Sequence, residues 1–99
     1  MTIKEKKLYI RALMKKRDSI ILEIDEFAET YATIRTLIHI GMFKEEDYAE
    51  VIDVLIASGK VALTTKMIIE EEIAKVNKEI DSEEKALTVL RRIIAGGEM

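Results

Sequence analysis

Four basic residues near the start of the chain lie at helical spacing and could bind an anion. Lys4, Lys7, Arg11 and Lys15 follow one another at steps of three or four residues, so on a helix they line one face. Such a row could follow a phosphate backbone, with binding driven by the release of counterions. The row belongs to a longer stretch, residues 4–17, that contains seven bases and one acid.

The rest of the chain favours a different role for this basic stretch. The formal net charge is −3, an acidic block at residues 18–29 follows directly, and a second acidic segment spans residues 70–84. Charge blocks of opposite sign set partner choice and register between packed helices. We therefore expect a helix end that faces solvent or an acidic helix. Binding to nucleic acid is the alternative, and binding to a membrane surface is a weaker one.

Arg17 and Glu83 are charged residues at positions where the sequence otherwise places apolar side chains. Each interrupts a regular row of aliphatic residues. Charges at such positions often specify helix register, although a long side chain at the rim can also reach water. An ion pair between Arg17 and Glu83, within one chain or between two, is therefore a hypothesis to test.

The sequence carries no pattern typical of an enzyme or a metal centre. His39 is the only histidine and there is no cysteine, so the convergent ligands of a metal site are missing. No nucleophile motif or glycine-rich phosphate loop occurs. We expect a non-enzymatic protein that needs no cofactor, with His39 stabilising a helix C-terminus through its partial positive charge.

Composition predicts one folded domain, residues 1–99, with 48% hydrophobic and 35% charged residues. No apolar run approaches the roughly 18–20 residues that cross a bilayer. The N-terminus lacks a secretory signal, so we expect a cytoplasmic protein. The abundance of Ile, Glu and Lys suggests a thermophilic source or an A/T-rich genome, and the small size suggests a viral or plasmid-borne protein.

Capping signals and apolar spacing predict an all-α fold, an elongated bundle of long amphipathic helices. The absence of proline and the placement of the glycines indicate helices at about residues 3–40, 44–57 and 61–95. Thr2 and Glu5 form a capping-box pattern at the first start, and Gly41 suits the first end. Asp81 offers a start signal inside the last helix, so that helix is either continuous, which we favour, or kinked there.

These helix lengths do not match, which predicts self-association. A second helix ending near residue 57 would cover only the C-terminal part of the first, leaving apolar residues without a neighbour. Exposed aliphatic rows favour burial between copies, so we expect a homodimer that completes the bundle and acts as an adaptor or regulator for an unknown protein partner. The predicted oligomer interface comprises Ile10, Leu13, Arg17, Ile20, Ile24, Phe27, Glu83, Leu87 and Leu90.

Overall fold

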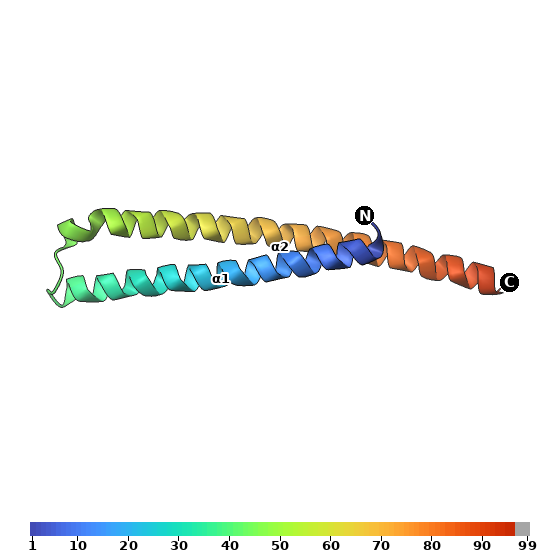
Figure 1. The fold of residues 1–99 in the computed structure, drawn as a ribbon, viewed down its shortest axis with the longest axis horizontal. Helices are drawn as coiled ribbons and strands as arrows, with labels where there is room; N and C mark the ends of the chain where they lie inside the picture. Colours follow the sequence, from blue (N-terminus) through green and yellow to red (C-terminus); the bar gives the residue numbers. More distant parts are fainter. Residues whose placement is uncertain (97–99) are drawn as a thin grey trace.

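The chain folds into a long antiparallel helical hairpin. The computed structural model describes residues 1–96, in which α1 spans Ile3–His39 and α2 spans Glu45–Gly96 (Figure 1). The molecule measures 80 × 19 × 16 Å, and its radius of gyration is 23.1 Å. A compact protein of this length would have a radius of gyration of about 13 Å. The predicted all-α class and elongated shape are confirmed.

The ends of α1 form as the local sequence predicts. The hydroxyl of Thr2 accepts the backbone N–H of Glu5 at 3.1 Å, and the Glu5 carboxylate accepts the backbone N–H of Thr2 at 2.9 Å. At the other end, Gly41 has a φ of 83° and donates to the carbonyl of Ile38, while Met42 donates to that of Leu37. This paired capping motif satisfies carbonyls that the helix leaves free. His39 lies in the last turn of α1, as predicted.

Contacts across the turn hold the start of α2 against the end of α1. The guanidinium of Arg35 donates to the carboxylate of Glu45 at 3.0 Å and also to the hydroxyl of Tyr31. The rings of Phe43 and Tyr48 stack with their centroids 4.2 Å apart. These contacts fix the closed end of the hairpin.

The predicted division between a second and a third helix is wrong. Residues 58–60 continue as helix, so the expected helices 44–57 and 61–95 are one 52-residue helix, α2. Gly59 is compatible with helix at a modest cost, and α1 runs alongside to bury the face that continues through it. α2 also passes through Asp81 without interruption, which confirms the favoured alternative there.

Replacing Gly59 with alanine is expected to stabilise the hairpin by about 0.8–1 kcal/mol. Alanine loses less conformational freedom than glycine in a helix, and a Cβ added at Gly59 would meet no atom within 4 Å. Urea unfolding followed by circular dichroism measures the change. Unchanged or lowered stability would mean that the helix needs glycine at this position.

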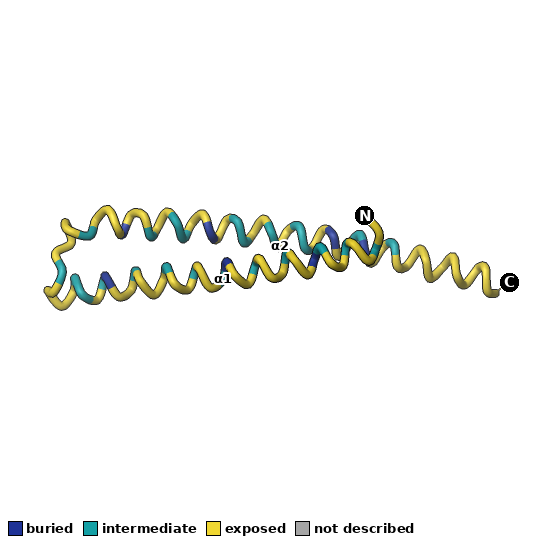
Figure 2. The backbone as a smooth tube through the Cα atoms, viewed as in Figure 1, coloured by how far each residue is buried: buried dark blue, intermediate teal, exposed yellow. Residues whose placement is uncertain are grey.

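The core is a single thin row of aliphatic residues between the two helices. Among the described residues, the buried ones are Ile10, Ile20, Ile34, Ile52, Ala62, Val76 and Ile80, and none is more than 97% buried (Figure 2). The accessible surface is 7656 Å². A compact monomer of 11.3 kDa exposes about 5,700 Å². One hairpin therefore leaves far more surface open than a typical monomer.

Candidate association surface

Ion pairs between α1 and α2, here called the clasp, hold together the open end of the hairpin, where α1 begins. The ammonium group of Lys6 pairs with the carboxylate of Glu83 and lies 3.8 Å from that of Glu79. One residue along, Lys7 pairs with Glu84 at 3.1 Å. These contacts place the start of α1 beside residues 79–84 of α2, so they fix the register between the helices.

α2 continues past this clasp as an unpartnered helix end. Residues 85–96, here called the overhang, are all exposed, and the part after Leu87 extends beyond the N-terminus of α1 by about 14 Å (Figures 1 and 2). The apolar row that packs on α1 through Val76 and Ile80 continues into the overhang at the same alternating spacing. Its further members are Leu87, Leu90 and Ile94, whose exposed fractions are 38%, 51% and 72%.

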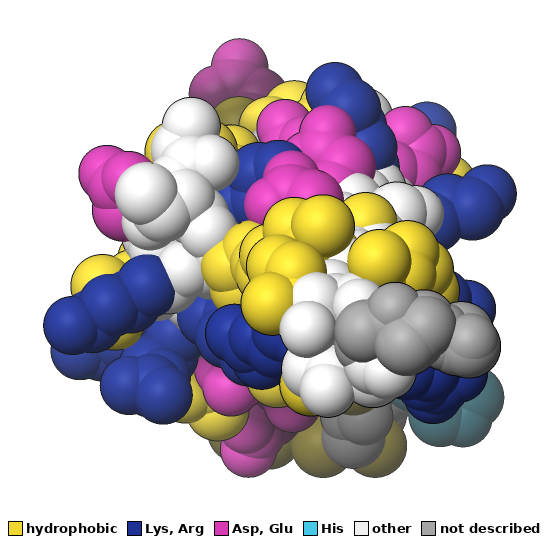
Figure 3. All heavy atoms as spheres, turned by 90° about the vertical axis from the view of Figure 1, so that its right-hand side faces the viewer, with side chains coloured by type: hydrophobic (Ala, Val, Ile, Leu, Met, Phe, Trp, Pro, Cys, Tyr) yellow, Lys and Arg dark blue, Asp and Glu magenta, His cyan; other side chains and the backbone are white. Residues whose placement is uncertain are grey.

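Hydrophobic side chains gather on the end of the molecule that carries the overhang, with both acidic and basic side chains around them (Figure 3). A groove of about 680 Å³ lies where α1 begins beside the overhang. It is lined by Ile3, Lys4, Lys7, Leu8, Arg11, Glu84, Leu87, Thr88 and Arg91. The floor of this groove is aliphatic, and its rim carries more bases than acids.

A second apolar surface runs along one side of the hairpin. A groove of about 300 Å³ is lined by Ile24, Phe27, Ala28, Tyr31, Leu55, Ile56, Gly59, Lys60 and Leu63. Ala28 and the residues seven and fourteen before it, Ile21 and Met14, follow one line on α1. We call the side formed by Met14, Ile21, Ala28, Ile56 and Leu63 the groove face. The groove on the opposite side of the hairpin, about 400 Å³, has Lys16 and Glu23 among its lining residues.

The structure divides the predicted oligomer-interface residues into two groups. Ile10 and Ile20 are buried in the hairpin, while Leu13, Arg17, Ile24, Phe27 and Glu83 are half-buried. The N-terminal half of α1 therefore has a neighbour, contrary to the prediction, because α2 is long enough to cover it. Leu87 and Leu90 are exposed, and their role between copies stays a prediction.

An ion pair between Arg17 and Glu83 does not form within the chain. Arg17 instead contacts its neighbour Asp18 at 3.2 Å, and Glu83 contacts Lys6. Eleven residues separate Lys6 from Arg17, which is about 16 Å along a helix, so the intrachain form of the hypothesis is wrong. Sequence reasoning missed Lys6, although it stands at row spacing between Ile3 and Ile10. The register between the helices was needed to recognise its partner.

Three of the four candidate anion-binding residues share one groove. Lys4, Lys7 and Arg11 line the groove at the open end, where Arg91 of α2 joins them, and Lys15 lies outside this groove. The ion pair between Lys7 and Glu84 neutralises part of this charge. The sequence contained no signal that Arg91, eighty positions after Arg11, belongs to the same cluster.

Comparison with known proteins finds no match: no family model fits the chain, and neither a curated protein nor a solved structure is significantly similar to it. No helix within residues 1–96 has the length and apolar character needed to cross a membrane. Function must therefore be inferred from the surface described above.

Reversing the charges of Lys6 and Glu83 tests the clasp. Lys6→Glu and Glu83→Lys are each expected to lower the thermal midpoint, because each places like charges together, and the double variant is expected to recover most of the loss. Circular dichroism measures the midpoints, with the exposed Lys16→Glu as a control. If the two single effects simply add, the side chains do not interact.

The same clasp predicts a loss of stability at alkaline pH. The hydrogen bond to Glu83 is the main cause that raises the pKa of Lys6 above its ordinary value of 10.5. Because the pKa is raised in the folded chain, this contribution is complete at neutral pH and disappears as the pH rises through the folded pKa. The Lys6→Glu/Glu83→Lys variant, which keeps one lysine in the pair, is expected to lose stability in the same window.

Proposed function

We propose that the protein is a non-enzymatic, self-associating helical adaptor that acts through protein–protein interaction. The observation that carries this proposal is the apolar row of α2, which continues past the end of α1 with Leu87, Leu90 and Ile94 exposed. Each aliphatic side chain removed from water contributes about 1.5–3 kcal/mol. Covering these residues with a second copy is therefore favourable.

A further exposed stripe suits contact with a different protein. Val54, Val61 and Ile68 lie seven residues apart on α2 and are exposed by 63%, 67% and 60%. This spacing places them along one line of the helix, away from the groove face, and Val61 also lines the groove on the opposite side of the hairpin. A rigid apolar stripe of this kind is a docking surface for an amphipathic partner helix. It gives the adaptor an outer face that remains open after self-association through the groove face.

Measurement of mass in solution tests the self-association. Light scattering coupled to size exclusion, at chain concentrations from 1 to about 100 μM, is expected to give twice the chain mass of 11.3 kDa. A stable, helical monomer across this range would contradict the proposal.

Binding of a nucleic acid through the open-end groove is the second candidate. The convergence of Lys4, Lys7, Arg11 and Arg91 favours it. Fluorescence anisotropy with a labelled DNA duplex and a labelled single-stranded RNA tests it. If this candidate is correct, binding at about 20 mM salt weakens steeply by 200 mM and is reduced by Arg11→Glu. Absence of binding at low salt removes it.

A further inference from the structure

The groove face has the extent that a stable interface needs. α1 is about 55 Å long and the hairpin is 19 Å wide, so the face over which the two helices run side by side has a footprint of about 1,000 Å². A standard interface buries about 800 Å² on each partner. Three members of the groove face, Met14, Ile56 and Leu63, are each exposed by 41–48%, and the last two lie among apolar neighbours in the groove. A partner that covers about four-fifths of this face would therefore suffice.

Charges level with one another on the two helices are of opposite sign. At the open end, the ion pairs place Lys6 and Lys7 of α1 beside acids of α2. Near the middle of the hairpin the acid is on α1 and the base is on α2. Asp25 follows Ile24 in α1, and Ile24 lines the same groove as Lys60 of α2. Asp25 and Lys60 are both exposed, and neither forms an ion pair with another residue of the described chain.

A second copy places opposite charges against each other when its long axis runs in the same direction as that of the first. A two-fold axis parallel to the hairpin then places α1 of each copy over α2 of the other at the same level. Because Ala28 and Ile56 line one groove, Ala28 comes to lie over the partner's Ile56, and Asp25 comes to lie near the partner's Lys60. Around Ala28 apolar residues thus meet apolar ones, and opposite charges flank them.

The direction of pairing also decides what happens to the overhangs. In a parallel pair both overhangs project from the same end of the bundle, beyond the first residues of both α1 helices. No other helix then lies between their apolar rows. Leu87, Leu90 and Ile94 are spaced three and four residues apart, which is the repeat of a two-stranded coiled coil. In an antiparallel pair the overhangs leave opposite ends, and both apolar rows stay in water.

We infer that two copies pair face to face and parallel through the groove face, and that their overhangs continue as a two-stranded parallel coiled coil. This inference rests on the proposed self-association and adds its surface and direction. The interface is isologous, so the pair closes and does not propagate into a filament.

Glutamate substitutions test the surface. Leu63→Glu places a charge in the groove face and is expected to raise the dissociation constant at least a hundredfold. Val61→Glu, two residues away on the exposed stripe, is the matched control and is expected to leave the mass unchanged. Circular dichroism checks that both variants remain helical. A dimer that resists Leu63→Glu and dissociates with Val61→Glu would overturn the assignment of the groove face.

Single cysteines test the direction, because the chain contains none of its own. Leu90→Cys is expected to form a disulfide between copies on mild oxidation, and Arg92→Cys, on the polar side of the overhang, is expected to form little. Spin labels on Met42→Cys, at the closed end, are expected to lie within about 40 Å of each other by pulsed electron resonance. In an antiparallel pair that overlaps along the whole of α1 they would be separated by about 55 Å.

The possible outcomes separate this inference from the proposed function. A dimer with a long distance between the labels overturns the parallel arrangement and leaves self-association intact. A short distance without the Leu90→Cys disulfide overturns the coiled coil of the overhangs. A monomer overturns both the inference and the proposed function.

Discussion

Leu90→Asp is expected to convert the protein from a dimer to a monomer while leaving the hairpin folded. Leu90 lies in the overhang and is 51% exposed, so the single chain does not depend on it. Because Leu90 exposes about half of its side chain, burial against a second copy is worth about 0.8–1.5 kcal/mol for each leucine, and a dimer loses two of them and must also take two carboxylates out of water. The dissociation constant should therefore rise by at least about a hundredfold.

Sedimentation equilibrium on the wild type, Leu90→Asp and Ser82→Asp measures this effect. Ser82 is an exposed position eight residues earlier in α2, outside the apolar row, so its variant adds the same carboxylate without the loss of burial. Equal masses for all three proteins at micromolar concentration would show that the overhang takes no part in association.

Ile80→Ala is expected to lower the free energy of unfolding by about 2–4 kcal/mol. Ile80 is 5% exposed and packs with Ile10 and Val76 where α1 and α2 meet. The core consists of one row, so few neighbours can move to fill the space that the missing atoms leave. Since small proteins are stable by only about 5–15 kcal/mol, this is a large fraction of the total.

The matched control for Ile80→Ala is Ile68→Ala, which makes the same chemical change at a side chain that is 60% exposed. Urea unfolding at one fixed chain concentration keeps the contribution of association constant between variants. Ile68→Ala is expected to change the unfolding free energy by less than about 0.5 kcal/mol. Similar losses at the two positions would contradict the assignment of Ile80 to the core.

Local chemistry explains which features could be predicted from the sequence. The start of α1 depends on Thr2 and Glu5, three residues apart, and its end depends on the positive φ of Gly41, so both follow from short stretches. The prediction that the helix ends at Gly59 was wrong. A helix continues through a glycine when the packing of the residues beyond it outweighs the cost of placing glycine in a helix. The packing that carries α2 through Gly59 comes from α1, more than twenty residues away in the chain.

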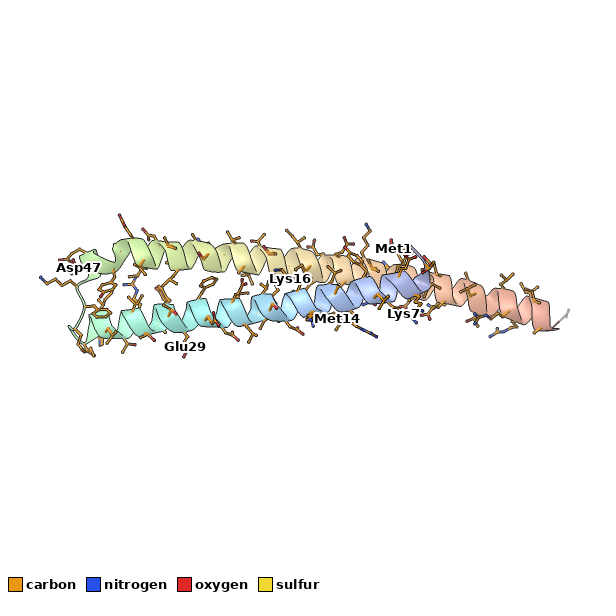
Figure 4. All side chains as sticks on the ribbon, in the orientation of Figure 1. Met1, Lys7, Met14, Lys16, Glu29 and Asp47 are labelled. Carbon is orange, nitrogen blue, oxygen red and sulfur yellow. The ribbon has the colours of Figure 1, made fainter. Side chains whose placement is uncertain are left out.

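The candidate site was predictable in part for a related reason. Leu87 and Leu90 continue an apolar row, and this periodicity is visible in the sequence. Their exposure follows only from the point at which α1 begins beside α2, as Figure 4 shows near Lys7. The groove that brings Arg11 and Arg91 together depends on the same register.

The sequence by itself therefore determined the all-α class, both ends of α1 and the apolar rows, because these depend on residues within one or two turns of each other. Only the tertiary structure decided that α2 is a single helix, that Lys6 rather than Arg17 pairs with Glu83, and that the overhang is left bare. These features depend on the register between α1 and α2. The two apolar rows are similar along their length, so several registers between the helices would give similar local contacts. Only the packing of the whole hairpin selects one register.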